Sequence, residues 1–175
     1  MRTVVLRVVA LSLLLLLALV AIITIRTLQR LPDTLIYFVR DEGVTFVLDP
    51  VARVGRESGL TARVKAQMAA LASGPSAEES AEGLSSVVPK TVEVRGVNLE
   101  GGRLTVDLSR DFAGGGGSAS MLGRLYQVMY TLSQPADVDE VLLLLEGEPL
   151  TLLGGEGILV EVPWVRDEHV ELPRW

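Results

Sequence analysis

The chain contains no cysteine and only one histidine, His169, among its 175 residues. Without cysteine there is no disulfide, no thiolate metal site, no cysteine nucleophile and no lipid attachment through an N-terminal cysteine. A single histidine cannot build a histidine metal site, and the charged neighbours of His169 favour a surface position. We therefore predict no metal centre and no cofactor.

Positive charge is also scarce after the first 30 residues. All 22 acidic residues lie in 31–175, with 12 of the 16 lysines and arginines, so this part has a formal charge of −10. An acidic domain repels phosphate backbones, which argues against nucleic acid as a partner. It also repels anionic lipid, so we expect the domain to stand off a bilayer surface.

Aromatic residues are few, and they form no ladder of the kind that lines a carbohydrate groove. Tyr37 and Phe38 are adjacent on a predicted strand, so one should face the core and leave the other open to a partner. Trp164 and Trp175 either pack against the domain or form a partner or glycan surface.

The N-terminal part of the chain contains one long apolar run. Val8 to Ile25 is 18 residues without a charge, roughly 27 Å as a helix, and a hydrocarbon core is about 30 Å thick. We predict a single-pass anchor in a cell membrane through residues 4–25, with the N-terminus inside and the domain on the extracytoplasmic side. A cleaved signal peptide is the alternative, although the run is long for one and ends without a small-x-small site.

The predicted organisation is a basic tail and anchor (or signal) over 1–30, a linker over 31–33, one domain over 34–170 and a C-terminal tail over 171–175. Hairpins and helices alternate within the domain. This order predicts an α+β fold with two layers, in which two helices pack on one face of a mixed, largely antiparallel sheet. The expected strands are 34–40, 44–48, 91–99, 103–108, 141–145 and 149–153, and 141–145 should be buried on both faces. The expected helices follow Ser58 and Ser118 as N-caps.

Two segments could carry chemistry. Asp107 and Asp111 lie near a strand end and could form an acid–base pair, but together with Ser109 they equally fit residues that cap turns. The run Gly114 to Gly117 before a helix could cradle an anion, or it is a flexible loop capped by Ser118. We favour the structural interpretation of both segments and predict that the protein is not an enzyme.

Several blocks of sequence resemble the GerMN domain of sporulation and spore-germination proteins. They are Ile36–Val39 with Leu48–Val51, 70–75 with 78–79 and 83–86, Leu104–Phe112, 130–134 with 138–141, and 147–150. Their order and spacing cover most of residues 34–167. The resemblance implies a ring-building-motif-like fold outside the cytoplasmic membrane, with no established catalytic residues.

The resemblance and the anchor together predict a membrane-tethered interaction or scaffold domain of a cell-envelope assembly. Its partners would be envelope proteins or further copies of itself, and the candidate contact surface comprises Tyr37, Asp107, Ser109, Asp111 and Trp164. The alternatives are a cell-wall or small-ligand-binding module and, with less support, a hydrolase that uses Asp107 and Asp111.

Overall fold

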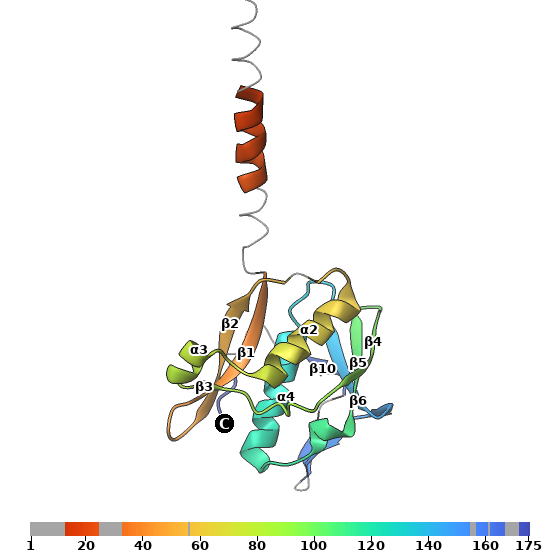
Figure 1. Cartoon of the computed structure of the whole chain (residues 1–175). Helices are drawn as coiled ribbons and strands as arrows, with labels where there is room; N and C mark the ends of the chain where they lie inside the picture. The colour runs from red at the N-terminus through yellow and green to blue at the C-terminus, as the bar shows by residue number, and fades with distance from the viewer. Residues whose placement is uncertain (1–12, 25–32, 56, 155–156, 161, 167–171) are drawn as a thin grey trace, which may run out of the picture. The chain divides into compact units, whose positions relative to one another are not determined.

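The computed structural model describes residues 13–24, 33–55, 57–154, 157–160, 162–166 and 172–175. The chain divides into two compact units, Met1–Asp33 and Thr34–Trp175. Figure 1 shows the elements of the second unit with their labels.

In the first unit, residues 13–24 form a helix with exposed apolar side chains. Within the described residues, no helix is long and apolar enough to cross a membrane. The predicted anchor also includes residues 4–12 and 25, and these, like most of the predicted linker, lie outside the described residues. The anchor therefore stays a prediction.

The second unit is built mainly from strands, with two long helices. Its elements are β1 (Thr34–Asp41), β2 (Phe46–Arg53), α2 (Leu60–Ser73), α3 (Ala77–Ala81), β3 (Leu84–Ser85), β4 (Val94–Glu100), β5 (Arg103–Leu108), η1 (Arg110–Ala113), α4 (Ser118–Leu132), β6 (Glu140–Leu145), β7 (Glu148–Pro149), β8 (Leu152–Leu153), β9 (Ile158–Leu159) and β10 (Trp164–Val165). The predicted α+β class and alternating order are confirmed.

The strands form two main sheets, where the sequence predicts one. One sheet has the order β2-β1-β3, and the other has the order β10-β6-β5-β4 with β7 beside β6. β5 and β6 run parallel and the other pairs are antiparallel, so the mixed character is confirmed. Helix α2 contacts both β1 and β4, and in Figure 1 the two helices lie between the sheets. The two-layer prediction is wrong because the helices bury apolar side chains against two sheets.

Side chains of α4 and of Gln134, just after its C-cap, take the place of a neighbouring strand along part of β1. β3 is so short that it pairs only with Val39 and Arg40. Further along β1, Leu35 donates its N–H to Gln134 (2.7 Å) and accepts from the Gln134 amide (2.6 Å). Tyr37 donates to the Thr131 hydroxyl (3.2 Å), and its carbonyl accepts from the Gln127 amide (3.0 Å). The β1 edge is thereby closed to a further strand.

Burial along β6 alternates, although its sequence is continuously apolar. Val141 and Leu143 are buried, whereas Leu142 and Leu144 are only half-buried. The prediction that 141–145 is buried on both faces is therefore wrong. The two helices cover one face of this sheet, so the opposite side chains of β6 remain partly open to solvent.

The helix boundaries differ from the predicted caps by one residue. Gly59 and Gly117 occupy the N-cap positions of α2 and α4, and neither helix has a side-chain cap hydrogen bond. Ser118 is the first helical residue instead of the cap. The predicted end of the first helix is confirmed at Gly74, whose φ of 81° suits glycine.

Residues 172–175 belong to the domain and do not form a separate tail. Trp175 exchanges two backbone hydrogen bonds with Phe46 (2.9 and 3.1 Å), and Arg174 bridges to Val47. The Trp175 indole N–H also donates to the carbonyl of Ala119 (2.9 Å) on α4. The predicted tail is corrected because the Trp175 ring buries apolar surface against α4 and β2.

Candidate functional site

Tyr37 and Trp164, two of the predicted contact residues, meet in one aromatic cluster. Tyr37 and Tyr130 have ring centroids 5.6 Å apart, and those of Tyr130 and Trp164 are 5.3 Å apart. The Arg166 guanidinium lies over both tyrosine rings (5.6 and 5.2 Å) and donates to the Tyr37 hydroxyl (3.0 Å). Tyr37 and Phe38 are both buried, at 3% and 0% exposure, so the prediction that one is exposed is wrong. The cluster joins β1, α4 and residues 164–166, which are far apart in the sequence.

Asp107 lies on the other sheet and stabilises a turn. One of its carboxylate oxygens accepts the Gly147 N–H (2.9 Å), and the other lies 3.4 Å from Nε of Arg95. Arg95 also pairs with Glu146, whose second oxygen accepts the Arg110 N–H (2.9 Å). Glu146 has a φ of 55°, and it begins the turn from β6 to β7. These contacts fix a strained turn against β4 and β5.

Ser109 and Asp111 do not join Asp107 in a common site. The Ser109 hydroxyl accepts the Glu93 N–H (3.0 Å), and the Ser109 N–H donates to the Glu93 carbonyl (2.9 Å). Asp111 is exposed on η1. In the described part of the chain, no group of three or more histidine and acidic side chains is placed to hold a metal ion; His169 lies outside it. The structural interpretation accounts for Asp107 and Ser109.

The contacts of Glu146 with Arg95 and Arg110 predict that its contribution to stability depends on pH. The backbone N–H of Arg110 and the side chain of Arg95 lower the pKa of Glu146 below its ordinary value of 4.5. A carboxyl with a lowered pKa stabilises the fold above its unfolded-state pKa, and this is lost as pH falls through the folded-state value. We expect Glu146→Gln to lower the urea midpoint at pH 7 and to have a smaller effect at pH 3, where a larger fraction of the carboxyl is protonated. The matched change Glu148→Gln, at an exposed position of β7 directly after the turn, should have little effect at either pH. Equal shifts from the two variants would contradict a stabilising role of the Glu146 contacts.

Arg124 is a buried cation that the sequence analysis does not single out. It is 4% exposed and donates to four carbonyls, those of Val87 (3.0 Å), Phe112 (2.6 Å), Gly114 (2.9 Å) and Gly115 (3.1 Å). Burial lowers the pKa of its guanidinium. The glycine-rich loop therefore turns carbonyls toward an internal cation, which supports its structural interpretation over the anion cradle.

A signal for Arg124 was present in the sequence. Met121 and Val128, three residues before it and four after it, both belong to the apolar stripe of α4. A charged residue between them must face the core side of the helix. What it binds there could not be read from the helix alone.

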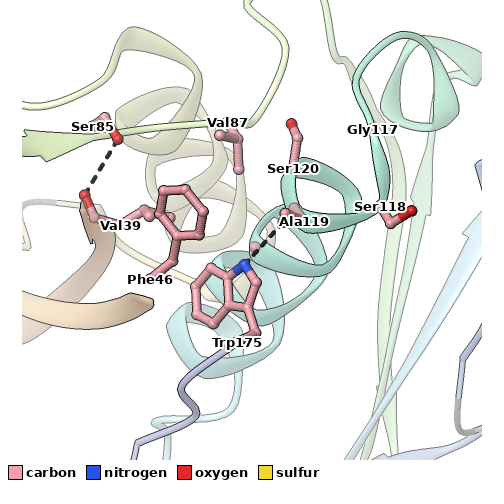
Figure 2. Close-up of a pocket in the computed structure, with 10 residues that line it drawn as sticks. Val39, Phe46, Ser85, Val87, Gly117, Ser118, Ala119, Ser120 and Trp175 are labelled. Atoms are coloured by element: carbon pink, nitrogen blue, oxygen red, sulfur yellow. Dashed lines mark hydrogen bonds between the residues drawn. The ribbon is translucent and has the colours of Figure 1, made fainter. Parts of the chain in front are cut away.

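A pocket of about 490 Å³ lies beside Trp175 and is partly open to solvent. Figure 2 shows the rings of Phe46 and Trp175 on one side of it and residues from the start of α4 on the other. Val39 and Val87 add apolar surface, and Ser85, Ser118 and Ser120 contribute hydroxyls. Its volume is in the range of small-molecule sites.

Gly123 makes room for the aromatic wall of this pocket. A Cβ at Gly123 would lie 2.8 Å from Cζ2 of Trp175 and 3.4 Å from Cγ2 of Val87. A glycine inside a helix is unfavourable by about 1 kcal/mol relative to alanine. At this position it lets the indole lie directly against the helix backbone.

Comparisons with known proteins agree with this architecture. The structure of tandem GerMN domains of the sporulation protein GerM from Bacillus subtilis is similar, with a TM-score of 0.62 and 22% identity; the match covers 79% of this chain and 45% of that one. The first GerMN domain of the same protein gives a TM-score of 0.57 and 20% identity, covering 77% and 98%. No curated protein matches the chain.

The GerMN resemblance seen in the sequence is confirmed by these folds and by a family comparison. This chain spans less than half of the tandem structure, so the likeness concerns the fold of one module. The family described as "Germane: Sporulation and spore germination" matches residues 35–151, and the chain belongs to that family.

Proposed function

We propose that this chain is a membrane-tethered scaffold domain on the extracytoplasmic side, where it binds another protein of the cell envelope. Family membership supports a GerMN-type role. The observation that carries the proposal is a concentration of exposed apolar side chains in residues 152–165. Surfaces of this kind are typical of protein contacts.

These side chains are large and well exposed. Leu152 and Leu159 face each other across the β8–β9 ribbon at 56% and 82% exposure, and Val162 and Val165 are 41% and 57% exposed. In the described part of the second unit, Val44 is the only other large apolar side chain that is exposed. Burial of each such side chain in a contact contributes about 1.5–3 kcal/mol.

The hydrolase alternative lacks the geometry that it requires. Asp107 is engaged by Gly147 and Arg95, and Asp111 is an exposed residue of η1. The small-ligand alternative, in contrast, is favoured by one observation, the apolar pocket beside Trp175. The two remaining functions do not exclude each other, since Leu159 does not line that pocket.

A photo-reactive residue placed at position 159 of the full-length protein tests the protein contact in the cells of origin. We expect discrete adducts with an envelope protein because the Leu159 side chain is 82% exposed. The matched control is the same residue at Ala69, an exposed position on α2, which should give none of these adducts. Adding Leu152→Ser should reduce the adducts at least fivefold, and equal labelling from positions 159 and 69 would refute the contact.

The tether is tested separately by fractionation. Because the uncharged run Val8–Ile25 is long enough to span a bilayer, the protein should stay in the membrane pellet after alkaline extraction. Its domain should be cut by protease added to the extracytoplasmic side. Release into the soluble fraction at the size of residues 31–175 would instead support the cleaved signal peptide.

A further inference from the structure

The pocket beside Trp175 has a lining whose chemistry restricts what can occupy it. None of the side chains of the described residues that line it carries a charge. Transfer of an ionised group to such a site without a partner is strongly unfavourable. The lining therefore selects an uncharged ligand.

The walls of the pocket favour a flat ring. Phe46 and Trp175 have ring centroids 6.1 Å apart and planes inclined at 31°, so their surfaces form a splayed aromatic wall. Ring pairs in offset or edge-to-face contact gain about 0.5–1.5 kcal/mol beyond the burial of their area. Gly117, Ala119 and Gly123, from α4 and its N-cap, also line the pocket, and none of them has a side chain larger than a methyl group to fill it.

The aromatic wall is fixed in place before any ligand binds. The Trp175 indole is held by its hydrogen bond to Ala119 and by the two backbone bonds to Phe46. The Ser85 hydroxyl, also in the lining, donates to the Val39 carbonyl (3.3 Å), and Figure 2 draws both side-chain hydrogen bonds. A rigid wall reduces the entropy that binding must overcome.

We propose that this pocket binds a neutral aromatic ring, which stacks on Trp175 and Phe46. The ring could belong to a free compound or to an aromatic side chain of a peptide, because the same lining would recognise both. This inference goes beyond the proposed scaffold function. Ring binding is measured on the purified protein without an envelope partner, so failure of ring binding and failure of the crosslinking experiment can be told apart.

The test uses quenching of Trp175 fluorescence in the full-length protein in lipid nanodiscs. Trp164→Phe leaves Trp175 as the only tryptophan, and Trp164 does not line the pocket. The neutral probe is 4-nitrobenzyl alcohol, the charged analogue is 4-nitrobenzoate, and the peptide probe is a capped Gly-Xaa-Gly in which Xaa is 4-nitrophenylalanine. Quenching of N-acetyltryptophanamide with empty nanodiscs gives the collisional and partitioning background.

We expect saturable quenching by the neutral probe, with binding at least tenfold weaker for 4-nitrobenzoate. Saturation by the alcohol assigns the site to free compounds, and saturation by the peptide alone assigns it to side chains. Ala119→Leu places a larger side chain in the lining and should weaken binding at least tenfold, whereas Ala69→Leu, at an exposed position of α2, should not.

Three results would overturn the proposal. The first is that neither the alcohol nor the peptide quenches Trp175 more strongly than it quenches N-acetyltryptophanamide with empty nanodiscs. The second is equal binding of the neutral and the charged probe. The third is unchanged binding in Ala119→Leu, whose folding is checked against Ala69→Leu by thermal unfolding followed by circular dichroism.

Discussion

Arg124→Met is expected to lower the free energy of unfolding by about 3 kcal/mol. The substitution keeps an unbranched side chain of similar length but removes all donors to Val87, Phe112, Gly114 and Gly115. Each carbonyl left without a partner costs about 1 kcal/mol or more. Removal of a buried charge offsets part of this cost, but four lost acceptor contacts outweigh it. Urea unfolding at pH 7, followed by circular dichroism, measures the difference.

Two further variants make this prediction specific. Arg124→Lys keeps the charge and three donors, so it should recover part of the lost stability if the carbonyl contacts matter. Lys65→Met changes the same charge at an exposed position of α2 and should change stability by less than about 0.5 kcal/mol. If Arg124→Met and Lys65→Met have the same free energy of unfolding, the hydrogen bonds from Arg124 to the four carbonyls contribute nothing to stability.

Gln127→Leu is expected to cost a similar amount, about 3 kcal/mol. Gln127 is completely buried, donates to the Tyr37 carbonyl (3.0 Å) and accepts the Val87 N–H (2.9 Å). Leucine fills most of the volume but leaves a donor and an acceptor unpaired beside β1. We expect earlier unfolding in urea and faster hydrogen exchange at the amide of Val87, whose acceptor is removed.

Gln127→Glu separates hydrogen bonding from volume. An ionised carboxylate at position 127 could still accept from Val87 but could not donate to Tyr37, whereas a protonated carboxyl could do both. Burial disfavours the charged form, which raises the pKa of such a carboxyl. The Gln127→Glu variant should therefore lose less stability, relative to wild type, at pH 5 than at pH 8. The deficit of Gln127→Leu should not change with pH, and a parallel change in both variants would contradict the hydrogen-bond account.

Local patterns determined the parts of this protein that the sequence predicted well. The apolar stripe through Met121, Leu125 and Val128 predicted α4, and the alternation in 103–108 predicted β5. Gly74 ended α2 because its φ of 81° is accessible to glycine at little cost. The ordered blocks of the GerMN module led to the correct family. Each of these signals lies within a few residues of the element that it specifies.

The candidate site could be predicted only in part. Asp107 is correctly interpreted as a residue that caps a turn, since it accepts the Gly147 N–H. Ser109 caps no turn with its side chain, because its hydroxyl accepts the N–H of Glu93, which precedes β4. Tyr37 was expected at a contact surface, but Trp164, Tyr130 and Arg166 enclose it. Burial of a strand residue depends on which elements cover each face, and periodicity within one strand does not contain that information.

By itself, the sequence determined the apolar N-terminal run, the acidic domain, the helices, most strands and the family. Only the tertiary structure decided that two sheets form, that α4 completes the edge of β1, and that residues 172–175 close a pocket. Gln127 and Tyr37 are 90 residues apart, and Trp175 and Ala119 are 56 apart. Such contacts form where whole elements pack together, so they depend on the shapes and unpaired backbone groups of distant segments.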